Sequence, residues 1–107
     1  MKNYHLLGMK GIRDCNNRKI QLEYYIVEIN NELAGPVYGI RIIKHLKEQQ
    51  ITEKEESWGI SKDRSEVERL ALTFMENEVM PVTLIELADE YVTLKTAERS
   101  RAAICAY

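Results

Sequence analysis

The hydrophobic pattern of this chain changes its period near Ser61, and no other feature constrains the fold as strongly. Before that point, apolar residues come in short runs rich in β-branched and aromatic side chains, separated by turn residues. After it, they recur every three or four residues. The first pattern is typical of strands and the second of amphipathic helices. We therefore expect a sheet-forming front half followed by a helical back half.

Three strands are predicted, over residues 20–29, 37–46 and 51–60. The first run is apolar on both faces over its middle, so it is either covered on both sides or meets a partner on its second face. Gly39, inside the second run, indicates a bulge or a place where an aromatic ring covers the backbone. The third run is the most polar and is expected at an edge. The short connections favour an antiparallel meander.

Two helices are predicted after the strands. Asp63, or alternatively Ser65, is expected to cap the first helix, and Pro81 to end it. Thr83 is expected to cap the second, which is predicted to continue toward Arg101 with a frayed end. The apolar stripe of the first helix has the spacing i, i+3, i+4, i+7, i+8: Val67, Leu70, Ala71, Phe74 and Met75.

These elements predict one α+β domain, a three-stranded antiparallel β-meander followed by two α-helices packed on one face of the sheet. The domain is assigned to residues 20–95. Residues 1–19 are expected to form an N-terminal arm, and residues 96–107 a tail or helix extension. The predicted core is Leu22, Tyr25, Val27, Tyr38, Ile40, Ile42, Val67, Leu70, Phe74, Leu84, Leu87 and Tyr91.

Charge is distributed unevenly along the chain. Residues 1–47 carry eight Lys and Arg against four Asp and Glu, whereas residues 48–107 carry seven against thirteen. Differently solvated faces explain this distribution. A dipolar surface that pairs with a copy of the same chain is the sharper interpretation.

The sequence offers little for catalysis or for metal binding. His45 is the first candidate catalytic residue, but the sequence identifies no partner for it, and a surface histidine is the expected role. The two His and two Cys are too far apart to form a zinc site, and the glutamates at 53, 55 and 56 do not converge in a strand. We therefore predict no catalytic residues, no cofactor and no metal.

An interaction surface is better supported than an enzyme. Aromatic residues are favoured at the centres of interfaces, and the first strand offers more apolar surface than one helical layer can cover. The alternative is that the N-terminal arm or the C-terminal tail covers the second face of the sheet. The residues assigned to the possible interaction surface are Tyr24, Ile26, Arg41, Ile43, His45 and Trp58.

The stretch from Tyr24 to Val92 resembles a known family. Tyr38-Gly39-Ile40, Ile60-Ser61 and Met80-Pro81 ahead of Leu84 and Leu87 are the motifs that carry the likeness. The stretch is similar to a family of small uncharacterised proteins of Gram-positive anaerobes, a domain of unknown function. The resemblance implies an intracellular bacterial protein and no particular activity.

The sequence thus predicts a small non-enzymatic cytoplasmic module that regulates or binds proteins and self-associates through its sheet. Its partner is expected to be itself or another protein, and no membrane segment is expected. A nucleic-acid-associated regulator is one alternative, although the chain is acidic overall, with a pI of about 5.7. A small ligand-binding protein or enzyme is the other.

Overall fold

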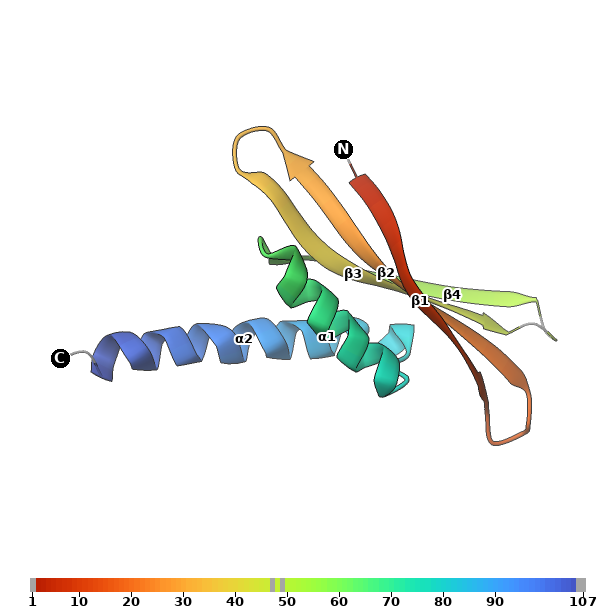
Figure 1. Cartoon of the computed structure of the whole chain (residues 1–107). Coiled ribbons are helices and arrows are strands. Elements are labelled where there is room, and N and C mark those ends of the chain that lie inside the picture. Colours follow the sequence, from red (N-terminus) through yellow and green to blue (C-terminus); the bar gives the residue numbers. More distant parts are fainter. Residues whose placement is uncertain (1, 47, 49, 106–107) are drawn as a thin grey trace.

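The front half of the chain forms one antiparallel sheet of four strands (Figure 1). The strands β1 (Lys2–Arg13), β2 (Lys19–Asn31), β3 (Gly35–Leu46) and β4 (Ile51–Ser61) lie in sequence order across the sheet. This computed structural model describes residues 2–46, 48 and 50–105, with side-chain surroundings given as far as Thr96. The predicted α+β class is confirmed, whereas the prediction of three strands is wrong.

The additional strand is β1, which occupies most of the segment expected to be an arm. It pairs antiparallel with β2 from Lys2 to Arg13. A shift of register between Leu6 and Gly8 moves the alternation of side chains to the other face. Because this bulge breaks the period of two, the apolar residues of β1 do not read as a strand in the sequence. The prediction of a separate arm is therefore corrected.

The other strands agree closely with prediction, and Gly39 does mark a bulge. The register of the β3–β4 pair shifts between Tyr38 and Ile40. A Cβ at Gly39 would lie 2.0 Å from the carbonyl oxygen of Ser57 and 3.0 Å from the Cα of Trp58. The backbone of β4 therefore approaches β3 so closely that only glycine fits.

Two helices, α1 (Arg64–Glu76) and α2 (Pro81–Cys105), pack on one face of the sheet (Figure 1). Asp63 caps α1 as predicted, because its carboxylate accepts a hydrogen bond from the backbone N–H of Ser65 at 3.0 Å. Thr83 does not cap α2. It lies in the first turn and donates its hydroxyl to the carbonyl of Met80 at 3.1 Å. Pro81 begins α2 instead of ending α1, since proline lacks the N–H that a first helical residue leaves unused.

The core lies between the helices and the face of the sheet that carries Tyr24 and Ile26. Both side chains are buried, and the register pairs them with Ile42 and Ile40 of β3. The Tyr24 hydroxyl donates to the Val79 carbonyl at 3.0 Å, which joins the sheet to the link between the helices. The buried cluster is Ile20, Leu22, Tyr24, Ile26, Ile40, Ile42, Ile60, Val67, Ala71, Phe74, Leu84 and Ala88.

Two predicted core residues, Tyr25 and Val27, lie on the opposite face of β2. Tyr25 is partly exposed there, whereas Val27 is fully buried. The sequence could not choose between the faces of this strand because both are apolar. The alternation of β3, which is unambiguous, sets the choice through the register.

Candidate functional site

The sheet face that points away from the helices carries the candidate site, and we call it the open face. Neither helix lies over it (Figure 1). Leu6, Met9 and Trp58 are each more than half exposed on this face. By register, the open face comprises Lys2, Tyr4, Leu6, Met9, Gly11, Arg13, Lys19, Gln21, Glu23, Tyr25, Val27, Ile29, Val37, Gly39, Arg41, Ile43, His45, Thr52, Lys54, Glu56 and Trp58.

Four of the six residues assigned from the sequence to an interaction surface lie on this face: Arg41, Ile43, His45 and Trp58. Tyr24 and Ile26 do not. Both are almost completely buried under the helices, with 0% and 1% of their surfaces exposed. The assignment of these two is therefore corrected, and Tyr25 and Val27 take their place on the open face.

At one end of the face, side chains from both edge strands meet around one carboxylate. Glu56 accepts hydrogen bonds from the hydroxyl of Tyr4 at 2.8 Å, from the indole N–H of Trp58 at 2.5 Å and from the ammonium of Lys2 at 3.3 Å. Arg41 lies beside the same carboxylate, with its Nε 3.5 Å from Oε1. We call these five residues the Glu56 cluster.

The cations of the cluster also stack on its rings. The Lys2 ammonium lies 3.9 Å from the ring centroid of Trp58, and the Arg41 guanidinium lies 4.6 Å from that of Tyr4. Such cation–π contacts attract the cations to the faces of the rings. The rings and cations thus hold one another in place with few free rotations.

The Glu56 cluster explains why Val27 is buried on a face without a helix. Val27 pairs with Gly39 across the β2–β3 ladder, and Tyr4 is its partner on β1. The small residue at 39 and the close approach of β4 bring the two edge strands within reach of each other's side chains. The cluster therefore covers a second, smaller apolar centre that consists of Val27 and the backbone at Gly39.

The charge of Glu56 is stabilised by this setting. Burial acts to raise the pKa of the Glu56 carboxyl, but hydrogen bonds from Trp58, Tyr4 and Lys2, together with the positive charge of Lys2, outweigh burial. The net effect lowers the pKa of Glu56 below its ordinary value. A carboxylate that accepts several hydrogen bonds is expected to stay ionised.

A second polar group lies farther along the open face, around His45. The Nε2 of His45 lies 3.1 Å from Glu23 and its Nδ1 lies 3.3 Å from the hydroxyl of Thr52. The hydroxyl of Tyr25 donates to the other oxygen of Glu23 at 2.7 Å, and this hydrogen bond raises the pKa of Tyr25 above its ordinary value. A hydroxyl, an imidazole and a carboxylate in series form the order of a hydrolase triad. Here the carboxylate of Glu23 also accepts a hydrogen bond from Tyr25. The three side chains lie along a surface hollow of about 460 Å³.

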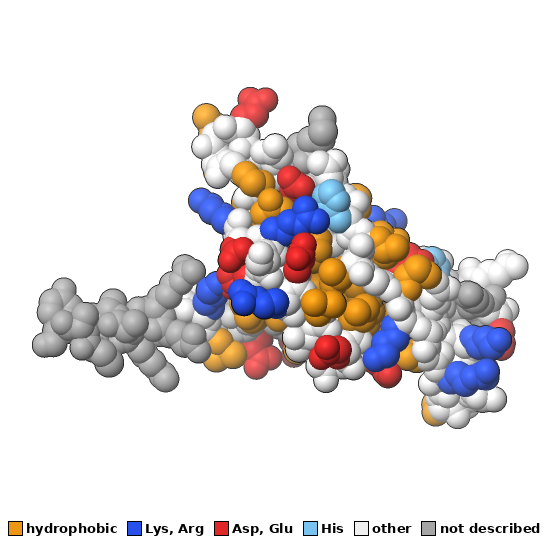
Figure 2. Space-filling view, in the orientation of Figure 1, with side chains coloured by type: hydrophobic (Ala, Val, Ile, Leu, Met, Phe, Trp, Pro, Cys, Tyr) orange, Lys and Arg blue, Asp and Glu red, His pale blue; other side chains and the backbone are white. Residues whose placement is uncertain are grey.

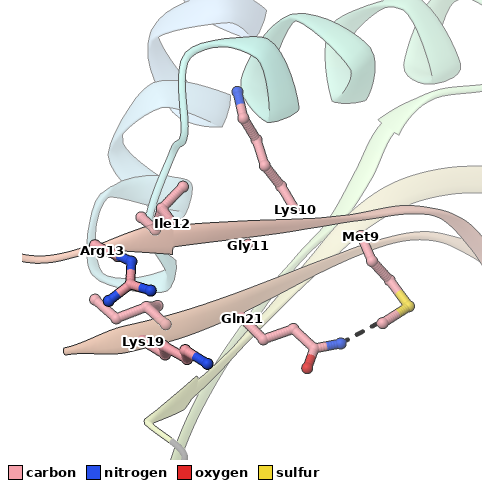
Figure 3. Close-up of a pocket in the computed structure, with 8 residues that line it drawn as sticks. Met9, Lys10, Gly11, Ile12, Arg13, Lys19 and Gln21 are labelled. Atoms are coloured by element: carbon pink, nitrogen blue, oxygen red, sulfur yellow. Dashed lines mark hydrogen bonds between the residues drawn. The ribbon is translucent and has the colours of Figure 1, made fainter. Parts of the chain in front are cut away.

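The free end of the β1–β2 hairpin is basic (Figure 2). A hollow of about 670 Å³ lies along it, beside Gly11, where an added Cβ would meet no atom within 4 Å. Figure 3 shows Lys10 pointing toward the helices, where its ammonium donates to the carbonyls of Met75 and Glu76 at 3.3 Å. Arg13 and Lys19, by contrast, stay at the hairpin end.

Within residues 2–46, 48 and 50–96, whose side chains the structure describes, no three His, Cys, Asp or Glu side chains come together as metal ligands. In the same part of the chain, neither helix combines the length and the apolar character needed to cross a membrane.

Sequence reasoning missed Lys2, Tyr4 and Glu56. The only signal for them was the spacing of Glu56 and Trp58, two apart in a strand and therefore expected on one face. No signal in the sequence pointed to Lys2 or Tyr4, because nothing in their positions along the chain indicates that they lie close to β4.

The fold and its open face define a class of small α+β domain, an antiparallel four-stranded sheet with helices on one side only. Residues 3–94 match the model of a family of unknown function, DUF6514, and the chain belongs to that family. The match covers β1 from Asn3 onward, a strand that lies before the stretch from Tyr24 to Val92. No curated protein and no solved structure matches the chain.

Proposed function

We propose that the chain is a small non-enzymatic protein-interaction module that self-associates through the open face of its sheet. The single observation that carries this proposal is the exposure of Leu6, Met9 and Trp58 on a face that neither helix covers. Exposed apolar side chains gathered on one face, rimmed by polar groups, are typical of interaction sites.

The Glu56 cluster gives this surface the composition of an interface centre. Trp, Tyr and Arg are the residues that most often dominate binding energy. Here Trp58, Tyr4 and Arg41 are already ordered by contacts with one another and with Glu56. Because a preordered side chain loses less conformational freedom on binding, the cluster favours association.

Arg41 retains donors for a partner. Its guanidinium lies against Tyr4, and Nε is buried with no hydrogen-bond partner among the described residues. The ion pair with Glu56 at 3.5 Å uses that same Nε. The terminal nitrogens of Arg41 therefore remain suited to a carboxylate from another molecule.

Sedimentation velocity of the full chain at micromolar concentrations tests the proposal, with Leu6→Glu as the variant. Leu6 is 54% exposed and lies outside the buried core, so its replacement is expected to leave the fold intact. We expect the wild type to associate and the variant to sediment as a monomer. Leu33→Glu is the matched control, because Leu33 is 99% exposed in the β2–β3 turn. A monomeric wild type, or a Leu6→Glu variant that associates like the wild type, contradicts the proposal.

The setting of this function is inferred from the resemblance noted in the sequence. We infer that the module acts in the cytoplasm of a Gram-positive anaerobic bacterium, in a regulatory role. Fractionation of such cells, followed by detection of the chain in the soluble cytoplasmic fraction, tests this inference. Recovery in the membrane or culture fraction would contradict it.

A further inference from the structure

We propose that the surface of the second copy that fills the open face is the exposed flank of its helix α2, so that copies associate sheet to helix. This inference rests on the proposed function, since it names the partner surface for the same face. The support comes from the apolar residues, charges and dimensions of the two surfaces.

One flank of α2 carries an apolar stripe. Val82 is 83% exposed, and Ile85 and Val92 are each 40% exposed. Spacings of three and seven residues place the three side chains on one side of a helix. Ile85 and Val92 stand three residues before and four residues after the buried Ala88, so the stripe lies along a flank of α2 beside the core. The stripe is therefore an apolar surface that this chain buries only in part.

Carboxylates accompany the stripe. Glu86, Asp89 and Glu90 are exposed, and none of them has a hydrogen bond or ion pair with the side chains that the structure describes. Over the helical segment 63–96 as a whole, the acidic residues are Asp63, Glu66, Glu68, Glu76, Glu78, Glu86, Asp89 and Glu90, against Arg64, Arg69 and Lys95.

The open face has the opposite charge. Its basic side chains are Lys2, Arg13, Lys19, Arg41 and Lys54, against Glu23 and Glu56. Lys19 and Lys54 form no hydrogen bond or ion pair within the described part of the chain. Unpaired cations on one surface and unpaired carboxylates on the other favour contact between the two surfaces.

The same charges disfavour contact between two open faces. Such a pairing would place the excess of basic side chains of one copy against that of the other. Like charges brought together at an interface cost several kcal/mol. The dipolar arrangement thus selects the helical surface as the partner.

The dimensions of the two surfaces also match. The stripe from Val82 to Val92 is about 15 Å long at 1.5 Å per residue. Four strands spaced about 4.8 Å apart are about 14 Å wide. One α2 segment can therefore span the sheet from β1 to β4.

A sheet-to-helix contact is heterologous, because each copy uses a different surface. Each copy then keeps one free sheet and one free helix. Association is expected to continue beyond a dimer as concentration rises, unless the rotation between copies closes a ring.

The test uses two variants that each lose one surface. Leu6→Glu with Lys54→Glu removes the sheet surface, and Val82→Lys with Glu86→Lys removes the helical one. All four positions are exposed, so both variants are expected to keep the fold, which circular dichroism checks. Leu33→Glu with Glu48→Lys is a control in turns away from both surfaces.

We expect each double variant alone to sediment as a monomer and an equimolar mixture of the two to form a dimer that grows no further. This result requires the intact sheet of one variant to bind the intact helix of the other. If the α2 variant alone still associates while the sheet variant does not, the sheet-to-helix contact is overturned and the proposed function stands. If the sheet variant alone associates, or if the wild type is monomeric, both the sheet-to-helix contact and the proposed function are contradicted. A mixture that stays monomeric also overturns the sheet-to-helix contact.

Discussion

At Gly39 the backbone of β4 passes so close to β3 that no methyl group fits between them. The atoms that a Cβ would meet, the Ser57 carbonyl oxygen at 2.0 Å and the Trp58 Cα at 3.0 Å, belong to the backbone and cannot rotate away. Gly11, by contrast, has room for a methyl group, because no atom lies within 4 Å of an added Cβ. These two glycines of the same sheet thus allow a matched comparison.

Gly39→Ala is expected to lower the free energy of unfolding by about 2–3 kcal/mol, the upper range for forced overpacking. Urea denaturation measures this change. Gly11→Ala is the control and is expected to change the stability by no more than about 0.5–1 kcal/mol, in the stabilising direction, because alanine loses less backbone entropy. Equal effects of the two substitutions would contradict the close approach of β4.

Tyr24 makes stability depend on pH in the alkaline range. Burial raises the pKa of Tyr24 to about 12 from an ordinary value of 10.0, with a smaller contribution from the negative charge of Glu78. The unfolded chain therefore ionises at a lower pH than the folded one. The stabilisation is complete below pH 10 and is lost as the pH rises from about 10 to about 12, by at most about 1.4 kcal/mol per pH unit.

Tyr24→Phe is expected to remove this pH dependence. At pH 7 the variant loses about 1 kcal/mol of stability, because the Val79 carbonyl loses its donor. The difference in stability between wild type and variant should shrink as the pH rises above 10, measured by urea denaturation at pH 8, 10 and 11. A difference that stays constant across this range would show that Tyr24 ionises equally in both states.

Among the elements, β1 and β4 form the two edges of the sheet, yet Glu56 joins them. It is held by Tyr4 and Lys2 from β1 and by Trp58 from its own strand. Because a lowered pKa means that the folded state favours the ionised carboxylate, this contribution to stability is present above the ordinary pKa of 4.5 and is lost as the pH falls through the lower folded value.

Glu56→Gln is expected to lower the stability at pH 7 by about 1 kcal/mol, since hydrogen bonds to a charged acceptor become neutral ones. The difference in stability between wild type and variant should become smaller as the pH falls below about 4.5. Thermal unfolding followed by the fluorescence of Trp58, the single tryptophan of the chain, measures both effects. A gap that does not change between pH 7 and pH 3 would contradict the role of the ionised carboxylate.

The elements also show what the sequence could predict. β2, β3 and β4 lie within two residues of their predicted bounds, because turn residues punctuate three clear runs. β1 was missed because its bulge between Leu6 and Gly8 hides the alternation. The Glu56 cluster was missed because it depends on how far the sheet curls, which is a property of all four strands together.

At the scale of the whole molecule, the sheet side is basic and the helical side is acidic. Self-association through these surfaces is expected to weaken with salt, because exposed charges are screened within about 10 Å at 0.1 M salt and about 3 Å at 1 M. We expect the average mass from light scattering to fall as sodium chloride rises from 50 to 500 mM. A mass that rises with salt would indicate a purely apolar contact instead.

The most direct test of the open face as the docking surface is a concentration series of ¹H–¹⁵N NMR spectra of the full chain. Trp58 contributes the single indole N–H signal, and it reports on the Glu56 cluster at one end of that face. We predict that this signal and the amides of Leu6 and Met9 shift or broaden as the concentration rises, while Leu33 in the β2–β3 turn does not change. Spectra in which the open-face signals stay fixed while the chain associates would contradict the account.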